Sequence, residues 1–317
     1  MKAVFLDLNS LDCDDLNLTA FEALFSRFTG YPATAPSEVS ERINTAEVVI
    51  VNKVVLDRAA LAGASQLKHI CIAATGTNNV DLAAAAELGV SVSNCQAYGT
   101  DSVAQHVMTL MLALHTNLLQ YNQAARDGQW ARADQFCLLS YPIQELRGKT
   151  LGIVGYGNLG SGVAQLAGAF GMDVVIAQRA GGETVGGRLA MAELLPQVDV
   201  LSLHCPLTEH TKDLIDATAI AQMKTGAFII NAARGGVVNE SDLADALRSG
   251  KLAGAATDVL TEEPPVNGNP LLADDIPNLI ITPHSAWGSV QARQRIVDQI
   301  VETIEGLAKG EQIRWVN

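Results

Sequence analysis

The sequence predicts an α/β protein built from two doubly wound parallel-sheet domains. Two series of short β-type runs alternate with amphipathic helical stretches, one within residues 1–98 and one that starts at Leu151. This alternation indicates parallel sheets covered by helices, because two parallel strands need a crossover connection that is usually a helix. A glycine-rich turn follows the first β-run of the second series, where doubly wound sheets bind ligands.

The first series is expected to contain four strands and two helices. The expected strands are Ala3–Leu6, Val48–Val51, Leu67–Ile72 and Val90–Val92. The expected helices are Leu16–Arg27 and Asp81–Leu88. A longer helix, Asp101–Ala125, should follow and join two domains, because apolar residues recur there at helical spacing.

The second series is expected to form an independent domain. Its strands are expected at Leu151–Val154, Val174–Ala177, Val200–Leu203, Ala227–Ile230 and Leu279–Thr282. A final amphipathic helix, Ser289–Lys309, is expected to return to the first domain. The sequence thus predicts one discontinuous domain of residues 1–98 and 286–317, with residues 99–285 as the other. The low-complexity segment Ala180–Gly187 fits a flexible surface loop and a cofactor-contacting segment equally well.

Composition excludes several classes of protein. The formal net charge of −13 opposes binding to nucleic acid or to anionic membranes, because both require clustered cations. The five cysteines are scattered and form no C-x-x-C pair, so we expect no metal site and a reducing cytoplasm. The first residues lack the apolar run of a signal peptide, which also favours the cytoplasm.

The turn Gly155-Tyr-Gly157-Asn158-Leu159-Gly160 fits the G-x-G-x-x-G pattern and lies between a β-run and a helical stretch. The first glycine permits a tight turn, the second lets a pyrophosphate approach the backbone, and the third permits close packing of helix and strand. The helix N-terminus would face the anion. The alternative, a tight turn alone, is disfavoured by this strand-turn-helix setting. We therefore expect a Rossmann cofactor domain here.

The residue that binds the cofactor's adenosine ribose lies about 20 residues further on, and an acidic residue at this position indicates NAD. Here the second β-run ends Ala177-Gln178-Arg179. Gln178 can form a ribose hydrogen bond without repelling a 2′-phosphate, and Arg179 can attract one. We therefore predict that the protein uses NAD or NADP, with appreciable use of NADPH.

Three later segments end β-runs: Asn231-Ala-Ala-Arg234-Gly, Asp258-Val-Leu-Thr-Glu-Glu263-Pro264 and Thr282-Pro-His284. With the glycine turn before them, they resemble the D-isomer-specific 2-hydroxyacid dehydrogenase family across essentially the whole chain. The segments Leu203–Thr208 and Gly99–Ala104 match as well. The nearest subgroup resembles the glycerate dehydrogenases, also called hydroxypyruvate reductases. The resemblance implies a flavodoxin-like substrate domain beside the Rossmann domain.

The resemblance implies a catalytic group of Arg234, Glu263 and His284. Arg234 would bind the substrate carboxylate through its planar fork, and a surface or capping arginine is the disfavoured alternative. His284 would be the proton donor in keto-acid reduction. Glu263 would hydrogen-bond His284 and stabilise its imidazolium, with the register fixed by Pro264 against the rival Glu262. The other five histidines, which lack such a motif, are expected to be satisfied core residues.

The resemblance also implies the wider binding site. Asp258 would accept a hydrogen bond from the nicotinamide carboxamide, although a cap or turn role stays open. The loop with Thr75 and Gly76 would complete the carboxylate site through its N–H groups, although a plain β-to-α turn is an equal alternative. Further cofactor contacts are implied for Val103, Cys205, Pro206 and Ala232. Two positions depart from the family pattern, Gln105 in place of Glu and Gln178 in place of the ribose-binding acid.

The predicted function is NAD(P)H-dependent reduction of a small 2-keto acid, hydroxypyruvate or glyoxylate, to the D-2-hydroxy acid, and the reverse oxidation. The alternative is an NAD-sensing binding protein of the co-repressor type, with little turnover. The family implies a homodimer, which the apolar helix after Asp101 and the segment Tyr121–Tyr141 would accommodate.

Overall fold

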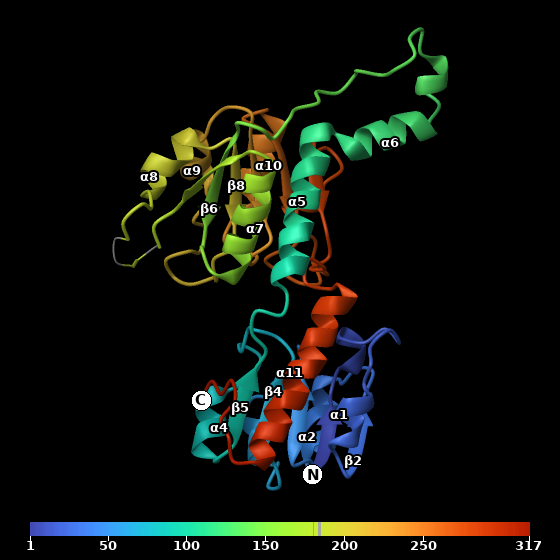
Figure 1. Cartoon of the computed structure of the whole chain (residues 1–317), viewed down its shortest axis with the longest axis vertical. Helices are drawn as coiled ribbons and strands as arrows, with labels where there is room; N and C mark the ends of the chain where they lie inside the picture. Colours follow the sequence, from blue (N-terminus) through green and yellow to red (C-terminus); the bar gives the residue numbers. More distant parts are fainter. Residues whose placement is uncertain (180, 183–184) are drawn as a thin grey trace. The chain divides into compact units, whose positions relative to one another are not determined.

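The computed structural model describes residues 1–179, 181–182 and 185–317. The chain divides into two compact units (Figure 1). Unit 1 comprises Met1–Gly99 and Gly288–Asn317, and unit 2 comprises Thr100–Trp287. Unit 1 is therefore discontinuous in sequence, with unit 2 inserted into it.

Unit 1 contains a parallel sheet with the strand order β2-β1-β3-β4-β5 among the described residues. The strands are β1 (Lys2–Phe5), β2 (Arg27–Gly30), β3 (Val48–Val51), β4 (His69–Ile72) and β5 (Ser91–Asn94). This order, 2-1-3-4-5, is that of flavodoxin-like folds. All residues of β3 and β4 are buried, as expected for central strands with helices on both faces.

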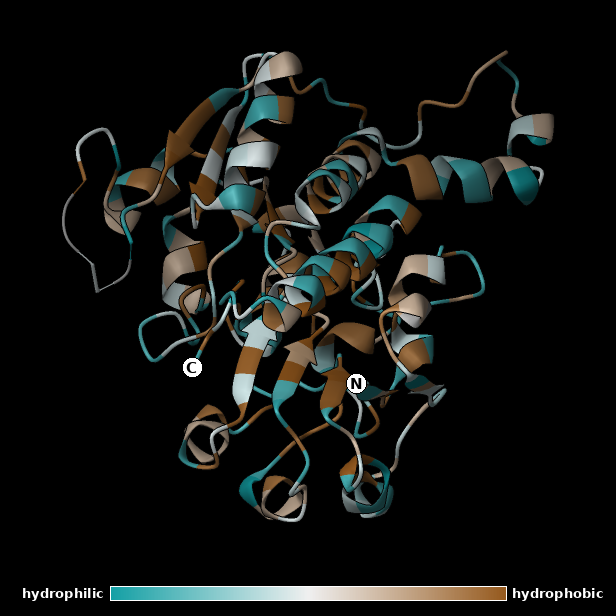
Figure 2. Cartoon of the chain, turned by 60° about the horizontal axis from the view of Figure 1, so that its bottom comes forward, coloured by the Kyte–Doolittle hydropathy of each residue, from teal (hydrophilic) through white to brown (hydrophobic). Residues whose placement is uncertain are grey.

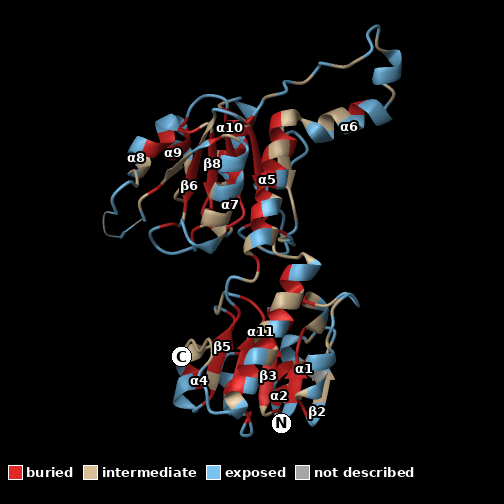
Figure 3. Cartoon of the chain, viewed as in Figure 1, coloured by how far each residue is buried: buried red, intermediate tan, exposed pale blue. Residues whose placement is uncertain are grey.

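Helices cover the sheet of unit 1, and their buried faces appear in red in Figure 3. They are α1 (Thr19–Ala23), α2 (Val39–Ile43), α3 (Arg58–Ala62), α4 (Leu82–Glu87) and α11 (Val290–Ala308). Helix α11 begins at the N-cap Ser289, whose side chain accepts a hydrogen bond from the Ala292 N–H. After α11, Trp315 forms an antiparallel bridge with Ser93, and the Val316 N–H donates to the Val92 carbonyl at 2.8 Å. The final residues thus cover the open edge of β5.

Unit 2 contains a second parallel sheet, with the order β11-β10-β9-β8-β6-β7 among the described residues. The strands are β6 (Thr150–Val154), β7 (Asp173–Ile176), β8 (Val200–Leu203), β9 (Ala227–Asn231), β10 (Leu252–Thr257) and β11 (Leu279–Ile281). Beyond β7, a single parallel bridge joins Ala177 to Leu189. With this bridge as a vestigial third strand, the order becomes 3-2-1-4-5-6-7, which extends the Rossmann order 3-2-1-4-5-6.

Helices also cover the sheet of unit 2, and Figure 2 shows the apolar strands in brown between helices of mixed polarity. They are α5 (Thr100–Thr116), α6 (Leu118–Arg126), α7 (Asn158–Ala169), α8 (Met191–Leu194), α9 (Ala217–Gln222) and α10 (Glu240–Arg248). Helices α5 and α7 pack closely: a Cβ atom added at Gly162 would lie 3.1 Å from Cγ2 of Thr100.

An arm extends from unit 2, consisting of α6 and the chain that returns from it (Figure 1). Its base is closed where the Tyr121 hydroxyl donates to the Tyr141 carbonyl at 2.7 Å and the Asn117 side chain donates to the Pro142 carbonyl at 2.6 Å. The arm exposes several large apolar side chains: Leu118, Leu119, Trp130, Phe136, Leu139 and Ile143. None of the helices in the described part of the chain is long and apolar enough to cross a membrane.

The fold class is confirmed, but several element predictions were wrong. The helix expected over Asp101–Ala125 is two helices, because Asn117 adopts a left-handed conformation (φ 49°) between them. The helix expected over Leu16–Arg27 is shorter, and Arg27 begins β2, a strand that the sequence did not reveal. Strand β10 was also missed. Residues 180, 183 and 184 of the segment Ala180–Gly187 lie outside the described residues.

Candidate active site

The three segments predicted to be catalytic follow neighbouring strands of unit 2. In the register of the sheet, Thr257 of β10 is paired with Asn231 of β9 on one side and with Ile281 of β11 on the other. The chain therefore leaves all three strands at the same edge of the sheet. This edge is where open α/β sheets bind ligands.

The His284 and Glu263 side chains are hydrogen-bonded: Nδ1 of His284 lies 2.6 Å from Oε2 of Glu263. The second carboxylate oxygen, Oε1, accepts the Leu260 N–H at 2.8 Å, which fixes the carboxylate from its other side. About a third of each side chain is exposed, 32% for His284 and 34% for Glu263. Because an ionised carboxylate only accepts hydrogen bonds, Nδ1 of His284 carries a proton, and Nε2 is the atom free to exchange one with a substrate.

The backbone of His284 is itself constrained. Its φ of 52° lies in the left-handed region, which is uncommon for residues other than glycine and recurs at functional sites. The His284 N–H donates to the Asp258 carbonyl at 2.8 Å and to the Thr282 carbonyl at 3.0 Å. These bonds hold an otherwise unfavourable conformation in place.

Arg234 is exposed at the end of the turn that follows β9. Within this turn, the Asn231 side chain donates to the Arg234 carbonyl at 3.1 Å, and Nη1 of Arg234 donates to the Ala233 carbonyl at 2.7 Å. Among the described residues, Arg234 forms no ion pair with a carboxylate, so its remaining donors are available to an anion. A Cβ atom at Gly235 would lie 1.9 Å from the Leu260 carbonyl oxygen, so only glycine lets this turn approach the segment that carries Glu263.

Asp258 is 2% exposed and organises the loop around His284. Its Oδ1 accepts from the Thr282 hydroxyl at 2.5 Å and from the Ser285 N–H at 2.9 Å, and its Oδ2 accepts from the Ala286 N–H at 3.0 Å. This geometry gives Asp258 the capping role that the sequence left open. A contact with the nicotinamide carboxamide stays a prediction.

The glycine turn fits a dinucleotide phosphate. A Cβ atom at Gly155 would lie 2.6 Å from the Cys205 nitrogen, and one at Gly160 would lie 2.2 Å from the Gly155 carbonyl oxygen. At Gly157, the N-cap of α7, an added Cβ atom would meet nothing within 4 Å. Contacts within the protein thus account for Gly155 and Gly160. Gly157 instead borders open space at the N-terminus of α7, in front of Asn158 and Leu159, and a bound pyrophosphate requires such space.

Gln178, the position predicted to bind the ribose, is partly engaged within the protein. The Gln178 side chain donates to the Val185 carbonyl at 2.9 Å and accepts the Val185 N–H at 3.1 Å, which closes the loop after β7. Arg179 beside it is exposed and forms no ion pair among the described residues. Among the described residues, the position thus presents a cation and an amide.

The other predicted contact residues lie in varied settings. Cys205 and Ala232 are 8% exposed, Val103 on α5 is 5% exposed, and Pro206 is exposed. Burial raises the pKa of the Cys205 thiol. Thr75 and Gly76 belong to unit 1, where they follow β4, and the Thr75 hydroxyl donates to the Cys95 carbonyl at 2.9 Å. Their role at the substrate carboxylate stays a prediction.

The expectation that the five remaining histidines are satisfied core residues was wrong in part. His210 is exposed, and Nε2 of His115 and Nδ1 of His204 have no hydrogen-bond partner among the described residues. His69 fits the expectation, since it is fully buried and both ring nitrogens contact serine hydroxyls, Ser91 at 2.7 Å and Ser93 at 2.8 Å. His106 contacts Thr282, a residue of the catalytic segments, at 3.0 Å.

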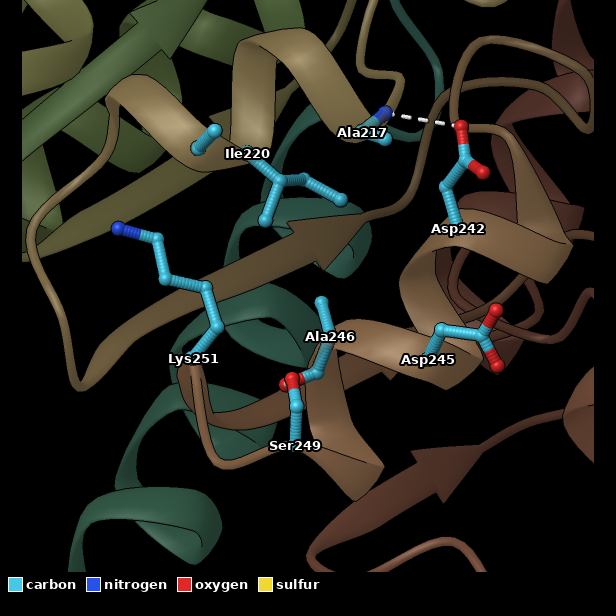
Figure 4. Close-up of a pocket in the computed structure, with 8 residues that line it drawn as sticks. Ala217, Ile220, Asp242, Asp245, Ala246, Ser249 and Lys251 are labelled. Atoms are coloured by element: carbon cyan, nitrogen blue, oxygen red, sulfur yellow. Dashed lines mark hydrogen bonds between the residues drawn. The ribbon is translucent and has the colours of Figure 1, made fainter.

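A separate cleft of about 470 Å³ lies between α9 and α10 (Figure 4). Its polar groups are already engaged: the Asp242 side chain accepts the Ala217 N–H at 2.8 Å, and the Lys251 ammonium donates to the Met223 carbonyl at 2.6 Å. Lys251 directly precedes β10, whereas Asp258 directly follows it. The cleft therefore lies away from the catalytic edge of the sheet.

Comparison with known proteins identifies the family of the chain. Residues 108–286 match the family model of the D-isomer specific 2-hydroxyacid dehydrogenase NAD binding domain. A glycerate dehydrogenase from Methylorubrum extorquens is 42% identical over 98% of this chain and 97% of its own length. A hydroxypyruvate reductase from Blautia hydrogenotrophica is 36% identical over the whole of both chains. An acyclic imino acid reductase, solved with NADPH and D-Arg, superposes with a TM-score of 0.87 at 26% identity over both full chains.

The resemblance inferred from the sequence is thereby confirmed. Both relatives span nearly the entire chain, so the similarity includes unit 1 as well as the cofactor-binding pattern of unit 2. The chain belongs to the D-isomer-specific 2-hydroxyacid dehydrogenase family, the enzymes that transfer a hydride between a nicotinamide cofactor and a 2-keto or 2-hydroxy acid.

Proposed function

We propose that this enzyme reduces hydroxypyruvate or glyoxylate to the corresponding D-2-hydroxy acid with NADH or NADPH, and catalyses the reverse oxidation. The observation that carries the proposal is the His284–Glu263 pair, at 2.6 Å, on the same sheet edge as the exposed Arg234. The names of the two relatives, glycerate dehydrogenase and hydroxypyruvate reductase, favour these small substrates.

Residues of the catalytic edge account for the proton chemistry. The bound nicotinamide supplies or accepts the hydride at the substrate's carbonyl carbon. In reduction, the carbonyl oxygen gains negative charge, and Nε2 of His284 donates the proton that neutralises it. Glu263 stabilises the imidazolium before this transfer. In oxidation, the neutral imidazole takes the proton from the substrate hydroxyl.

Substrate binding requires a cation, because the protein is acidic overall and a 2-keto acid carries a carboxylate. Arg234 supplies a planar guanidinium for a bidentate contact with that carboxylate. We assign the cofactor to unit 2 and propose that Thr75 and Gly76 bind the substrate carboxylate through their N–H groups. Bidentate contact orients the carbonyl carbon and so lowers the entropic part of the barrier.

We further propose appreciable use of NADPH. Gln178 places no negative charge where a 2′-phosphate would lie, and the exposed Arg179 offers a positive one. One structural relative was solved with NADPH bound. An exposed guanidinium that forms no ion pair within the described part of the chain, beside a neutral amide, favours NADPH more than the usual acidic residue would.

We also propose a homodimer that is formed through the arm, in the cytoplasm. The arm exposes 90% of Phe136 and 75% of Leu139, and large exposed apolar groups in one segment are typical of association surfaces. The cysteines of the described part of the chain are free thiols, which suits a reducing compartment. Light scattering should give twice the monomer mass, and Phe136→Ser combined with Leu139→Ser should shift the mass toward the monomer.

The activity is tested by the loss of absorbance at 340 nm, with NADH and NADPH separately. Hydroxypyruvate, glyoxylate, pyruvate and a bulkier 2-keto acid are compared by kcat/KM. We expect the first two substrates to be reduced best. An enzyme that binds the reduced cofactor but turns over none of these acids would instead support the co-repressor alternative.

A further inference from the structure

A histidine outside the predicted site contacts the loop that carries His284. His106 lies on α5, with Nε2 at 3.0 Å from the Thr282 hydroxyl oxygen and 3.6 Å from Oδ1 of Asp258. The His106 side chain is 22% exposed and the Asp258 side chain 2% exposed. His106 therefore lies at the rim of a buried polar network that includes two of the three catalytic segments.

The hydrogen-bond directions in this network can be assigned. The Thr282 hydroxyl has a single proton and lies 2.5 Å from Oδ1 of Asp258, an acceptor that also receives the Ser285 N–H. Because an ionised carboxylate cannot donate, the Thr282 proton points to Asp258. The contact between His106 and Thr282 then requires a proton on Nε2 of His106. The bonds run in one direction, from His106 through Thr282 to Asp258.

The hydrogen bonds of Asp258 also fix the loop that carries His284. Its carboxylate accepts the backbone N–H groups of Ser285 and Ala286, and its carbonyl accepts the His284 N–H at 2.8 Å. Thr282, before His284, and Ser285 and Ala286, after it, are thus all hydrogen-bonded to the Asp258 side chain. This arrangement supports the left-handed φ of 52° at His284.

Helix α5 holds the same loop at a second point. Ser102, one helical turn before His106, donates from its hydroxyl to the Ala286 carbonyl at 2.7 Å. Thr282 precedes His284 and Ala286 follows it, so α5 holds the loop on both sides of the catalytic histidine. Helix α5 also packs closely against α7, since a Cβ atom added at Gly162 would lie 3.1 Å from Cγ2 of Thr100 and 3.4 Å from Cβ of Ala104.

We propose that His106 is a positioning residue, which holds the His284 imidazole in line with Glu263 by ordering Thr282 and Asp258. The assignment rests on the proposed function, because it presumes that His284 transfers the substrate proton. Small displacements of a proton donor cost large factors in rate, since catalysis requires the reacting atoms to be held in place. His106 itself touches neither the substrate nor the cofactor in this role.

The tautomer provides a test that needs no turnover. In protein labelled with ¹⁵N at histidine, two-dimensional ¹H–¹⁵N spectra that connect ring nitrogens to carbon-bound protons distinguish Nδ1–H from Nε2–H. We expect His106 to carry its proton on Nε2, with that proton protected from solvent exchange, and to lose the protection in Thr282→Val. A neutral His106 protonated on Nδ1 alone would overturn the proposal.

The kinetic test uses three variants of matched shape. His106→Leu removes the donor, His106→Gln keeps an N–H donor at a similar reach, and Thr282→Val removes the hydroxyl without changing its outline. We expect His106→Leu and Thr282→Val each to lower kcat about tenfold, with a smaller change in KM, and to displace the pH profile of kcat. His106→Gln should recover most of kcat. The double variant should be no worse than the worse single one, because both act through one chain of bonds.

The control is His115→Gln on the same helix, since Nδ1 of His115 bonds to the Met111 carbonyl at 2.9 Å within α5 and, as far as the structure describes the chain, to no residue of the loop around His284. This variant should leave the pH profile unchanged.

If His106→Leu lowers thermal stability but keeps the wild-type kcat and pH profile, His106 is merely structural and the inference fails. If the wild-type enzyme reduces no 2-keto acid, the proposed function fails first, whereas the tautomer experiment still reports on the network. Should His106→Leu not fold, His106→Gln and Thr282→Val carry the test.

Discussion

Nδ1 of His284 lies 2.6 Å from Oε2 of Glu263, while Oε1 of the same carboxylate accepts the Leu260 N–H. The glutamate is therefore held by the backbone on one side and orients an imidazole on the other. This arrangement turns Nε2 of His284 away from Glu263. The carboxylate thus sets the direction in which the His284 imidazole points.

Replacing the charge of Glu263 should change the pH dependence of reduction. In Glu263→Gln the side chain keeps its size but no longer stabilises an imidazolium, so the optimum for keto-acid reduction should move to lower pH and kcat should fall about tenfold. The measurement is the pH profile of kcat. Glu262→Gln is the control, since the Glu262 side chain accepts from the Asn267 side chain instead. An unchanged profile in Glu263→Gln would exclude the assigned role.

The glycines of the phosphate turn should separate binding from stability. Gly157→Val should lower affinity for the reduced cofactor at least about tenfold with little change in unfolding midpoint, because an added Cβ atom meets no protein atom. Gly160→Ala should instead lower stability by about 1–3 kcal/mol, because its Cβ atom would lie 2.2 Å from the Gly155 carbonyl oxygen. Fluorescence titration and denaturant unfolding measure the two effects. Loss of stability in Gly157→Val with normal affinity would contradict the model of the turn.

Cofactor preference should respond to charge at the end of β7. Gln178→Glu places a carboxylate where NAD-selective proteins carry one, and Arg179→Ala removes the cation beside it. Each change should lower the ratio of kcat/KM for NADPH to that for NADH about tenfold. The value for NADH in the same variant is the internal control. A wild-type enzyme that strongly prefers NADH would defeat the prediction at once.

Acid should destabilise the protein through His69. Burial lowers the pKa of His69 to about 4, from an ordinary value of 6.5. Below pH 6.5 the unfolded chain therefore binds a proton that the folded chain refuses, so stability falls as the pH drops from 6.5 toward 4, by roughly 3 kcal/mol at most. Below about pH 4 this contribution no longer changes. In His69→Gln, the free energy of unfolding should depend less steeply on pH across that window. A slope identical to that of the wild-type protein would contradict this prediction.

The fold could be predicted where a buried segment has a characteristic residue composition. Strands such as β3 (VVIV) are central and β-branched, so their location followed from composition. Strand β10 (LAGAAT) has small residues instead, because its neighbours come close: a Cβ atom at Gly254 would lie 2.4 Å from the Asn278 side chain. Small residues carry little β propensity, so the strand that leads to Asp258 escaped detection.

The sequence offered candidates for the catalytic residues because their chemistry restricts residue type, whereas it offered none for the residues that support them. An arginine, a glutamate and a histidine in characteristic local sequences are recognisable from the chain alone. The contact between His106 and Thr282 joins positions 176 residues apart, and it depends on how α5 packs against the sheet. A histidine in an apolar helix gives no local sign of such a contact.

The insertion of unit 2 into unit 1 has a consequence for the order of folding during synthesis. Residues 1–99 leave the ribosome before unit 2, whereas α11 and the segment that pairs with β5 are made after it. Unit 2 is contiguous and can complete its sheet while unit 1 still lacks that helix. During translation, the earliest part of the chain thus has an uncovered sheet edge, and it reaches its final form only after the later part has folded.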